Sequence, residues 1–505
     1  MSSPSFLQRF ITVAGELPDH AAVVQEGRTT SYGELLDFAQ RLAHPIAGHP
    51  GSEEGTRVLI HLPQSAEAYG AMFACAMAGA VYAPVNVAAP LERQRLTVDK
   101  FAPEVIVTNG RLQAEAESLA GDAKVVVIDA LSDQRLSSPR PPARLVYVMF
   151  TSGSTGEAKG VMIPFDALSH YVSWAIEAME LTPRDRWSQH PNIAFDLSVL
   201  DIFGALCAGS TLYPLTDQID LLLTAKAIQR HGLTIWNSVP SVMTSMVKTK
   251  SVTAKNFESL RLLTFCGEPL LKLHLDAIFA ARPEVVVHNT YGPTEATVSC
   301  TLVRLTEDNY LPACGNSVAI GEAIPGMAIH LLDEDGVSGD EGEIVITGPQ
   351  VADGYWRAPE LSAGSFRDYV LDGQPVPAYY TGDWARREGA HTFFLGRRDN
   401  QVKIRGERIE LDDIAAAVVR CGWGMATVAK VGEELHAFVE AEGTPPDQEA
   451  AREALKHYLL RHLIPDRFHF LKHLPRNVND KIDRRKLIDW VRDGCPADLT
   501  KADAG

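Results

Sequence analysis

The stretch Leu145-Val-Tyr-Val-Met-Phe-Thr-Ser-Gly-Ser-Thr-Gly-Glu-Ala-Lys-Gly160 joins an apolar run to a loop rich in hydrogen-bond donors. Its first part, Leu145 to Phe150, combines β-branched and aromatic residues and predicts a buried strand. The loop from Thr151 to Gly160 contains glycines, which let backbone N–H groups approach an anion closely. Hydroxyl groups and the Lys159 ammonium add further donors and a positive charge. The stretch therefore predicts a polyphosphate-binding loop at the end of a strand.

This loop differs from the Walker type of phosphate-binding loop. Gly160 follows Lys159 at the place where a Walker loop has serine or threonine, and the glycine spacing also differs. A run of serine and glycine is by itself more often a flexible segment. The strand before the loop and the lysine within it favour the phosphate-binding interpretation.

Length and composition indicate a large globular chain. The chain has 505 residues. At one folding unit per ~150 residues, this length predicts several folding units. The chain is 46% hydrophobic and 22% charged, and no window approaches the ~18 unbroken apolar residues of a membrane helix. A net charge of −17 argues against a nucleic-acid-binding surface, so a nucleotide site must be a local positive pocket.

The cysteines and the first residues indicate the compartment. The 7 cysteines are scattered and form no Cys-x-x-Cys pair, which is typical of free thiols in a reducing environment. The first ten residues lack the basic start and apolar core of a signal peptide. We expect a cytoplasmic protein, monomeric and without a membrane span.

The order of apolar segments predicts an α/β fold. Strand-like runs alternate with alanine-rich helical patterns such as Ala66 to Ala80. The predicted strands of this body are 57–62, 102–108, 124–129, 233–236, 260–265 and 284–288. Together they predict a large N-terminal body of mixed α/β layers over residues 1–398.

After Gly321 the pattern changes to short strands separated by Gly and Asp turns. The runs 327–332, 342–347 and 392–395 predict a β-rich subdomain over about residues 321–398. A turn-rich break, Gly396-Arg-Arg-Asp-Asn400, then precedes a strand pair at 425–431 and 435–439. An amphipathic helix with Leu455, Leu459 and Leu463 on one face is expected to end before Pro465. Residues 399–505 are thus predicted to form a small α+β C-terminal domain.

Further motifs follow the first loop in order. They are Asn289-Thr-Tyr-Gly-Pro-Thr-Glu-Ala-Thr297, Tyr380-Thr-Gly-Asp383, Gly396-Arg-Arg-Asp-Asn-Gln-Val-Lys-Ile-Arg-Gly406 and Asn479-Asp-Lys-Ile-Asp-Arg484. With the loop at 151–160, the chain from about Ser31 to Arg485 resembles the adenylate-forming superfamily. It is most similar to the amino acid adenylation enzymes of nonribosomal peptide synthesis and their stand-alone relatives.

The resemblance implies a reaction in two steps. Such enzymes condense a carboxylate with ATP in the presence of Mg²⁺, release pyrophosphate, and pass the acyl group from AMP to a thiol. Because both reactants are negatively charged, the site needs cations and donors near the α-phosphate and pyrophosphate. The resemblance also implies a mobile, swivelling C-terminal domain with its hinge at Asp399, and a thiol tunnel lined by Lys403 and Gly406.

Residue by residue, the resemblance assigns the nucleotide site. Lys481 matches the family's catalytic lysine, with Asp480 in place of the usual preceding glycine. Thr294 and Glu295 match residues near the α-phosphate and Mg²⁺, and Asp383 matches the carboxylate that accepts the ribose hydroxyls. The full predicted ATP-binding set is Thr151, Ser152, Gly153, Ser154, Thr155, Gly156, Lys159, Asn289, Thr290, Tyr291, Thr294, Asp383, Arg397 and Lys481, in which Tyr291 offers a face to adenine.

A second set of positions predicts which acid the enzyme activates. Asp196 matches the aspartate that pairs with the α-ammonium group of an amino acid; an isolated aspartate is otherwise often a helix cap. The predicted pocket comprises Asp196, Leu197, Leu200, Asn237, Thr264, Cys266, Thr290, Val298 and Ser299. These residues offer no further charge for a charged side chain, and Leu197, Leu200, Cys266 and Val298 limit the volume, so a small side chain is favoured. The motifs look especially like those of D-alanine carrier-protein ligases, while L-alanine, glycine and serine stay open.

The partner of such an enzyme is a phosphopantetheine thiol on a separate carrier protein, because no carrier domain is evident in the chain. The nearest alternative is an acyl-CoA synthetase that uses the same adenylate route, against which Asp196 argues. A non-catalytic nucleotide-binding protein is a further alternative, disfavoured by Lys481, Asp383 and Glu295.

Overall fold

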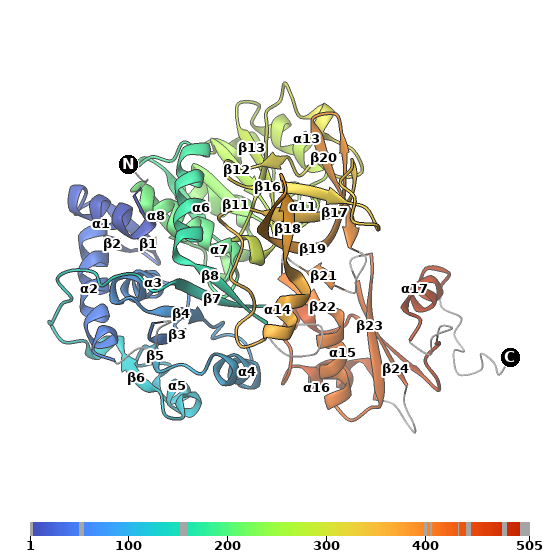
Figure 1. Ribbon diagram of the computed structural model, residues 1–505, viewed down its shortest axis with the longest axis horizontal. Helices are drawn as coiled ribbons and strands as arrows, with labels where there is room; N and C mark the ends of the chain where they lie inside the picture. Colours follow the sequence, from blue (N-terminus) through green and yellow to red (C-terminus); the bar gives the residue numbers. More distant parts are fainter. Residues whose placement is uncertain are drawn as a thin grey trace. The chain divides into compact units, whose positions relative to one another are not determined.

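A computed structural model describes residues 4–49, 55–151, 159–397, 401–404, 407–432, 434–440, 446–476 and 482–494 (Figure 1). The chain divides into two compact units. The large unit comprises residues 1–86, 100–150 and 160–398, and the small unit comprises residues 87–99, 151–159 and 399–505. No helix of the described segments is long and apolar enough to cross a membrane.

A mixed nine-stranded sheet forms part of the large unit. Its central strands β13, β12, β11, β9, β10 and β1 are parallel, and β14, β15 and β2 add antiparallel edges. In spatial order the strands are β15 (Glu322–Ala323), β14 (Thr301–Leu305), β13 (Val286–Tyr291), β12 (Leu262–Phe265), β11 (Ile235–Ser238), β9 (Arg186–Gln189), β10 (Thr211–Pro214), β1 (Ala21–Gln25) and β2 (Arg28–Ser31). Parallel strands are buried on both faces, which explains their continuous apolar runs.

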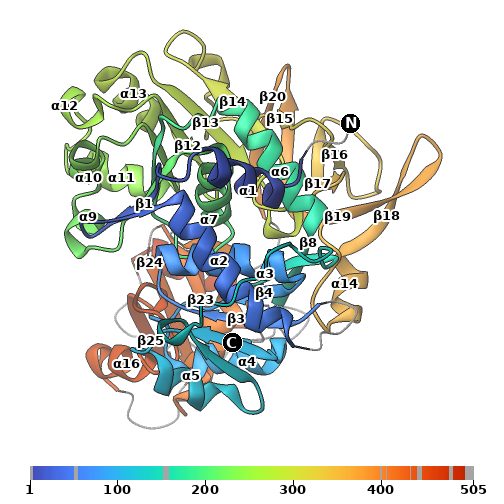
Figure 2. The ribbon, with the colours of Figure 1, turned by 90° about the vertical axis from the view of Figure 1, so that its left-hand side faces the viewer.

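Helices cover this sheet and share its core. Figure 2 shows α10 (Thr224–His231), α11 (Pro240–Lys248), α12 (Ala254–Phe257) and α13 (Lys272–Ala281) beside strands β12 and β13. Their apolar side chains pack in one cluster with those strands, around the fully buried Trp236. The remaining helical segments between β9 and β15 are α7 (Leu197–Val199), η2 (Leu200–Gly204), α8 (Ala205–Ala208), α9 (Gln218–Leu222), η3 (Thr294–Ala296) and η4 (Leu311–Ala313).

A six-stranded sheet is the second sheet of the large unit. Its order is β6 (Lys124–Val127), β5 (Val105–Thr108), β3 (Arg57–His61), β4 (Val81–Pro84), β7 (Leu145–Thr151) and β8 (Lys159–Pro164). The strand expected before the phosphate-binding loop is therefore present as β7. The helices of this region are α1 (Phe6–Glu16), α2 (Tyr32–Ala47), α3 (Ala66–Ala78), α5 (Gln113–Ala120), η1 (Ile128–Ala130) and α6 (Phe165–Ala178). Most of helix α4 (Leu91–Phe101) belongs to the small unit.

Helix α3 lies in the centre of the core. Its alanine-rich sequence is buried on every side except at Glu67, and Gly79 ends it in the left-handed conformation at φ 66°. Phe73 from this helix stacks on Phe10 with ring centroids 3.9 Å apart. Small residues let the helix sit close to its neighbours, and the aromatic rings fill the remaining space.

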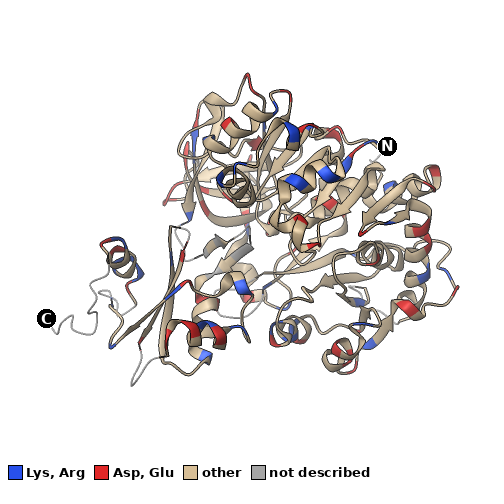
Figure 3. Ribbon diagram, turned by 180° about the vertical axis from the view of Figure 1, so that it is seen from behind, with Lys and Arg blue, Asp and Glu red and all other residues tan. Residues whose placement is uncertain are grey.

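The predicted β-rich subdomain is a five-stranded antiparallel sheet (Figure 1). Its strands are β16 (Ala328–Leu332), β17 (Glu341–Thr347), β19 (Gln374–Glu388) and β18 (Phe366–Leu371), with β20 (His391–Arg397) paired to β19, and α14 (Pro359–Ser365) precedes β18. The α/β fold class predicted from the sequence is confirmed. Acidic and basic residues are interspersed along the large unit (Figure 3), although acidic residues outnumber basic ones in the chain as a whole.

The small unit has its own apolar core. It contains the pair β21 (Gln401–Ile404) and β22 (Glu407–Glu410), and the sheet β23 (Met425–Val431), β24 (Glu434–Glu440) and β25 (Arg467–Leu471). Its helical segments beyond β22 are α15 (Leu411–Arg420), α16 (Gln448–Leu455), η5 (Arg461–Leu463) and α17 (Arg484–Arg492). The predicted strand pair at 425–431 and 435–439 is thus present as β23 and β24.

The predicted extent of the amphipathic helix is wrong. Helix α16 ends at Leu455, and the chain continues through a turn and a short 3-10 segment. Leu455, Leu459 and Leu463 are nevertheless buried in one cluster. The three leucines share a buried cluster, although they do not lie on one continuous helix.

Candidate functional site

Most of the predicted amino-acid pocket lies at the carboxyl edge of the nine-stranded sheet. Asn237 and Thr264 are direct neighbours on the parallel strands β11 and β12. Cys266 follows the end of β12, and Thr290 lies near the end of β13. Because alternate residues share a face, Thr264 and Cys266 point to the same side of the sheet. Ligands of open parallel sheets bind at this edge.

The segment after β9 supplies the next pocket residues. Leu197 begins the short helix α7, and Leu200 begins a π-helical turn, a geometry frequent at functional sites. The Asn237 Nδ2 atom donates to the Leu197 carbonyl at 3.4 Å, which ties this segment to β11. Sequence positions 40 residues apart are thereby brought together.

Asp196 stands immediately before α7. It is half-buried, and its side chain makes no hydrogen bond that caps the helix, so the helix-cap interpretation does not hold. Burial raises the pKa of Tyr171, and the Asp196 charge is among the causes that add to this rise. The Asp196 carboxylate thus acts electrostatically on Tyr171, whose hydroxyl is 3.2 Å from Ser299 Oγ.

Val298 and Ser299, two further residues of the predicted pocket, lie in a strained turn. Thr297 and Val298 have φ values of 55° and 70°, a conformation that is costly for β-branched residues. The Val298 carbonyl lies 3.9 Å from Cys266 Sγ, which donates to it. Strain of this kind is retained where the surroundings hold the backbone in place, and it sets the positions of two pocket residues.

Gly292 is required for this turn. A Cβ atom added to it would lie 2.4 Å from Ser299 Cα, 2.8 Å from the Val298 carbonyl oxygen and 3.0 Å from Cys300 N. All three neighbours are backbone atoms, so no side chain can rotate away.

We expect Gly292→Ala to lower the free energy of unfolding by ~1–3 kcal/mol through overpacking. The clash also moves Val298 and Ser299. If substrate binding loses a free energy similar to that lost in stability, amino-acid-dependent pyrophosphate exchange should fall by about tenfold or more. Thermal unfolding and exchange rates measure both effects. Gly15→Ala is the matched control, because nothing lies within 4 Å of that Cβ position in helix α1. Equal behaviour of the two variants would contradict this role of Gly292.

Three of the predicted nucleotide residues meet at a buried carboxylate. Asp383 and Arg397 are direct neighbours on β19 and β20, and Arg397 Nη1 lies 2.5 Å from Asp383 Oδ1. The Tyr291 hydroxyl donates to Asp383 Oδ2 at 2.5 Å. Burial, and then the Asp383 charge, raise the pKa of Tyr291 well above its ordinary value. Strand β13 of one sheet and the β19–β20 hairpin of another are joined at this point.

The polar motif after β13 is also buried. Thr294 and Glu295 open the segment η3, and the Tyr355 hydroxyl donates to Glu295 Oε1 at 2.7 Å. Asn289 Nδ2 donates to the Ala319 carbonyl at 2.9 Å, and Thr290 Oγ1 to the Phe265 carbonyl at 3.0 Å. Tyr355 was not predicted, although it holds the carboxylate proposed for the metal.

The carboxylates near the predicted nucleotide site limit how Mg²⁺ could bind. Within the described segments, no group of three or more His, Cys, Asp or Glu side chains is arranged to hold a metal. Mg²⁺ often binds proteins through one or two carboxylates and takes its other ligands from phosphates and water. A single buried Glu295 fits an ion that arrives with the nucleotide.

Part of the predicted set has no structural description. Ser152, Gly153, Ser154, Thr155, Gly156, Asp399, Gly406 and Lys481 lie outside the described residues, and of Lys403 only the backbone, in β21, is described. Thr151 ends β7 and Lys159 begins β8, so the loop connects two strands. Thr151 Oγ1 donates to the Lys159 carbonyl at 3.5 Å, which closes the base of the loop.

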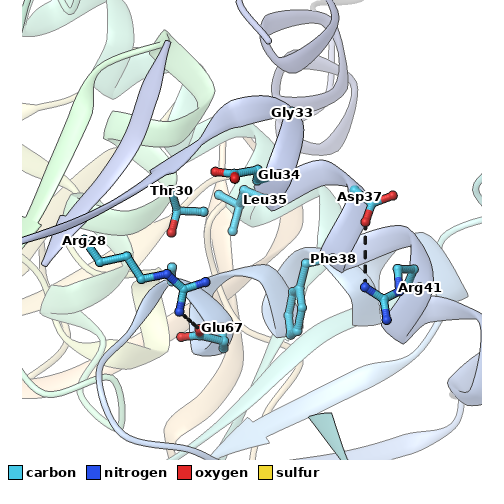
Figure 4. Close-up of a pocket in the computed structure, with 10 residues that line it drawn as sticks. Arg28, Thr30, Gly33, Glu34, Leu35, Asp37, Phe38, Arg41 and Glu67 are labelled. Atoms are coloured by element: carbon cyan, nitrogen blue, oxygen red, sulfur yellow. Dashed lines mark hydrogen bonds and ion pairs between the residues drawn. The ribbon is translucent and has the colours of Figure 1, made fainter. Parts of the chain in front are cut away.

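A hollow of about 430 Å³ lies elsewhere on the large unit, between β2, α2 and the start of α3. Two ion pairs lie among its charged side chains (Figure 4): Arg28 with Glu67 at 3.1 Å and Arg41 with Asp37 at 3.9 Å. None of the predicted site residues lines it. We therefore assign it no part in the site.

Comparison with known proteins identifies the family. The family model described as AMP-binding enzyme matches residues 10–356. The chain belongs to the AMP-binding enzymes. The resemblance to the adenylate-forming superfamily is thereby confirmed, and the protein is an AMP-forming ligase of that superfamily.

Individual relatives extend over nearly the whole chain. The D-alanine–D-alanyl carrier protein ligase of Bacillus licheniformis is 30% identical over 94% of this chain and 97% of its own length. The structure of the Vibrio cholerae adenylation domain AlmE in complex with glycyl-adenosine-5'-phosphate has a TM-score of 0.84 and 25% identity, with 98% of each chain covered. The o-succinylbenzoate CoA synthetase of Bacillus subtilis has the same fold, with a TM-score of 0.81 at 21% identity over 96% of this chain and 98% of that one.

Asp201 was missed by the sequence interpretation. It lies in the π-helical turn, is 0% exposed, and accepts a 2.6 Å hydrogen bond from Asn237 Nδ2. Burial raises its pKa well above the ordinary range, which the hydrogen bonds from Asn237, Trp187 and the His190 backbone partly offset. An acidic residue inside the apolar run Leu197-Ser-Val-Leu-Asp-Ile-Phe203 is the signal that could have revealed it.

Proposed function

We propose that this enzyme activates a small amino acid as aminoacyl-AMP and transfers it to the phosphopantetheine thiol of a separate carrier protein. The resemblance favours D-alanine, with L-alanine, glycine and serine as the other members of the set. The observation that carries the proposal is Asp196, whose half-buried side chain stands directly before α7, in the segment that also carries Leu197 and Leu200. A carboxylate there suits the α-ammonium group of an amino acid.

In the first step, a carboxylate oxygen of the amino acid attacks the α-phosphorus of ATP. The bond between the α-phosphorus and the bridging oxygen breaks, and pyrophosphate leaves. We assign the ribose to Asp383 and Arg397, the α-phosphate to Thr294, and Mg²⁺ to Glu295. The loop at 151–160, with Lys159, steadies the departing phosphates, and Lys481 neutralises charge at the reacting centre.

In the second step, the carrier thiolate attacks the acyl carbon and AMP leaves. We assign the approach of the thiol to Lys403 and Gly406, after a rotation of the C-terminal domain about Asp399. The named ligase of Bacillus licheniformis supports a carrier protein as acceptor. An acyl-CoA synthetase remains the second candidate, because the Bacillus subtilis CoA synthetase has the same fold.

Pyrophosphate exchange tests the first step. Wild-type enzyme is assayed with glycine, both alanines, both serines, a fatty acid and an aryl acid. Exchange with an amino acid and not with the other acids is expected; no exchange with any amino acid would overturn the proposal. Thiol acceptance is then measured with holo carrier protein and with coenzyme A, and a preference for coenzyme A would favour the second candidate.

Asp196→Ala is expected to raise the KM for the amino acid by about 30-fold, equivalent to the ~2 kcal/mol lost when a desolvated charge pair is broken. The KM for ATP should change little, because Asp196 is assigned only to the ammonium group. Steady-state exchange kinetics separate the two constants. Asp166→Ala, which removes an exposed aspartate from helix α6, is the matched control. An unchanged KM for the amino acid would refute the assignment.

A further inference from the structure

Three polar side chains form a row across the sheet beneath the predicted pocket. Asn237 on β11 is the direct neighbour of Thr264 on β12, which is the direct neighbour of His288 on β13. Thr264 lies two residues before Cys266, and His288 two residues before Thr290, so each shares its pocket residue's face of the sheet. The row is therefore one step further from the carboxyl edge than Cys266 and Thr290.

Each of these side chains is buried and carries a polar atom without a hydrogen-bond partner among the described residues. Asn237 and Thr264 are 0% exposed and His288 is 1% exposed. The unpartnered atoms are Asn237 Oδ1, Thr264 Oγ1 and His288 Nδ1. Asp201, which is also fully buried, joins the row through Asn237, whose Nδ2 atom donates to Asp201 Oδ1 at 2.6 Å.

Unpartnered buried polar atoms are costly. Each such group costs ~1–3 kcal/mol, and native proteins have few of them. Neighbouring side chains of this kind offer complementary hydrogen bonds to a ligand that reaches them from the pocket. Their place under the pocket makes that ligand the far end of the substrate.

The row also defines the charge of its partner. Burial, aided by the charges of Arg304 and Arg261, lowers the pKa of His288 to about 4, so the imidazole is neutral at pH 7. Burial raises the pKa of Asp201 and thus favours its protonated carboxyl. Neutral donors and acceptors suit a neutral polar group, while an ionised side chain would lack a counter-charge. A hydroxyl both donates and accepts, and it matches this mixture.

We propose that Asp201, Asn237, Thr264 and His288 form a polar floor that hydrogen-bonds the side-chain hydroxyl of the substrate, so that serine is preferred to alanine and glycine. The inference rests on the proposed amino acid activation, and it selects serine from the four candidate substrates. It assigns Asp201 and His288 to substrate specificity, through direct contact or through Asn237 and Thr264. Chirality is left to the experiment.

The test compares serine with alanine, each as both enantiomers, by pyrophosphate exchange with the full-length enzyme. We expect a serine enantiomer to have a kcat/KM about 100-fold above that of either alanine, because a site built for a hydroxyl discriminates strongly against its absence. Thr264→Val, which is nearly isosteric, should lower the ratio of the kcat/KM values for serine and alanine about tenfold. Thr264→Ser retains the hydroxyl and should keep the preference.

Asp201 provides an independent pair of variants. Asp201→Asn keeps a donor and an acceptor and should preserve the ratio of kcat/KM values for serine and alanine, whereas Asp201→Val should lower that ratio about tenfold. Thr108→Val, in the six-stranded sheet, is the matched control for a buried strand threonine. Thermal unfolding identifies any variant that fails to fold, and the wild-type comparison stands without the variants.

The outcomes separate the two proposals. Efficient exchange with alanine or glycine and weak exchange with serine would overturn the polar floor and leave the amino acid activation intact. An equal loss for serine and alanine in Thr264→Val would show that the row holds buried water only, and would also overturn it. Exchange with no amino acid would overturn the proposed function and the floor with it.

Discussion

Lys481→Ala is expected to lower the rate of adenylate formation by at least about a hundredfold, while the Kd for ATP changes no more than a few-fold. The ammonium group is assigned to the charge that develops as carboxylate and α-phosphate meet. An interaction made mainly in the transition state affects the rate and not ground-state binding. Single-turnover adenylate formation and equilibrium binding of ATP measure the two quantities separately.

The chain on both sides of Lys481 is firmly held within the small unit. Arg476 and Ile482 form an isolated β-bridge, and Ile482 packs against a cluster that includes Leu474 and Leu487. Arg484 donates through Nε to Thr427 Oγ1 at 2.7 Å and also pairs with Asp412. None of these contacts involves the Lys481 side chain, so its replacement should leave the fold of the small unit unchanged.

The control separates Lys481 from the basic residues that follow it. Helix α17 carries several Lys and Arg residues (Figure 3), among them Lys486, whose Nζ lies 5.7 Å from the centre of the Trp490 ring. Lys486→Ala also removes one positive charge. It should keep activity within about twofold, because the exposed cation–π contact it breaks contributes only ~0.5–1 kcal/mol, and this contribution is to stability and not to catalysis. Similar losses in both variants, or a loss of ATP binding in Lys481→Ala, would contradict the assigned role.

Asp383→Ala is expected to impair both stability and nucleotide binding. The side chains of Asp383 and Arg397 are 6% and 13% exposed. Removal of one partner leaves a largely buried charge uncompensated, which costs ~3–5 kcal/mol. If the carboxylate also accepts the ribose hydroxyls, the Kd for ATP should rise by about 100-fold, or ~2.7 kcal/mol. Chemical denaturation and nucleotide titration measure the two effects.

A double variant distinguishes structure from binding. Asp383→Ala combined with Arg397→Ala removes both charges, so part of the lost stability should return while ATP binding stays weak. Asp276→Ala, which breaks the exposed pair with Lys272, is the matched control and should change stability by only ~0–1 kcal/mol. Recovery of ATP binding in the double variant would show that Asp383 acts only by neutralising Arg397.

Local patterns predicted most of the large unit. Runs such as 57–62 and 260–265 were recognised as strands because parallel strands buried on both faces are apolar throughout. The same reasoning overextended helix α16. Three leucines at helical spacing satisfied the pattern, but spacing does not show whether buried residues belong to one helix or to a helix, a turn and a 3-10 segment.

The candidate site was predictable where it lies in contiguous motifs. Tyr291, Glu295 and Asp383 belong to such motifs, yet their partners do not: Tyr355 lies 60 residues from Glu295 in the sequence. His288 is part of an apolar strand, and its position suggests an ordinary core histidine. Only the strand register places it beside Thr264.

Spacing within the sequence predicted a phosphate-binding loop after a strand, an ordered set of motifs and an aspartate for an ammonium group; of these, the strand is present as β7 and the family indicated by the motifs is confirmed. These depend on residues close together in the chain, where spacing carries the information. The tertiary structure alone decided which distant groups meet, as with Tyr291, Asp383 and Arg397, and which polar atoms are left without partners beneath the pocket. Strand register and burial arise from packing across the whole core, so local spacing cannot specify them.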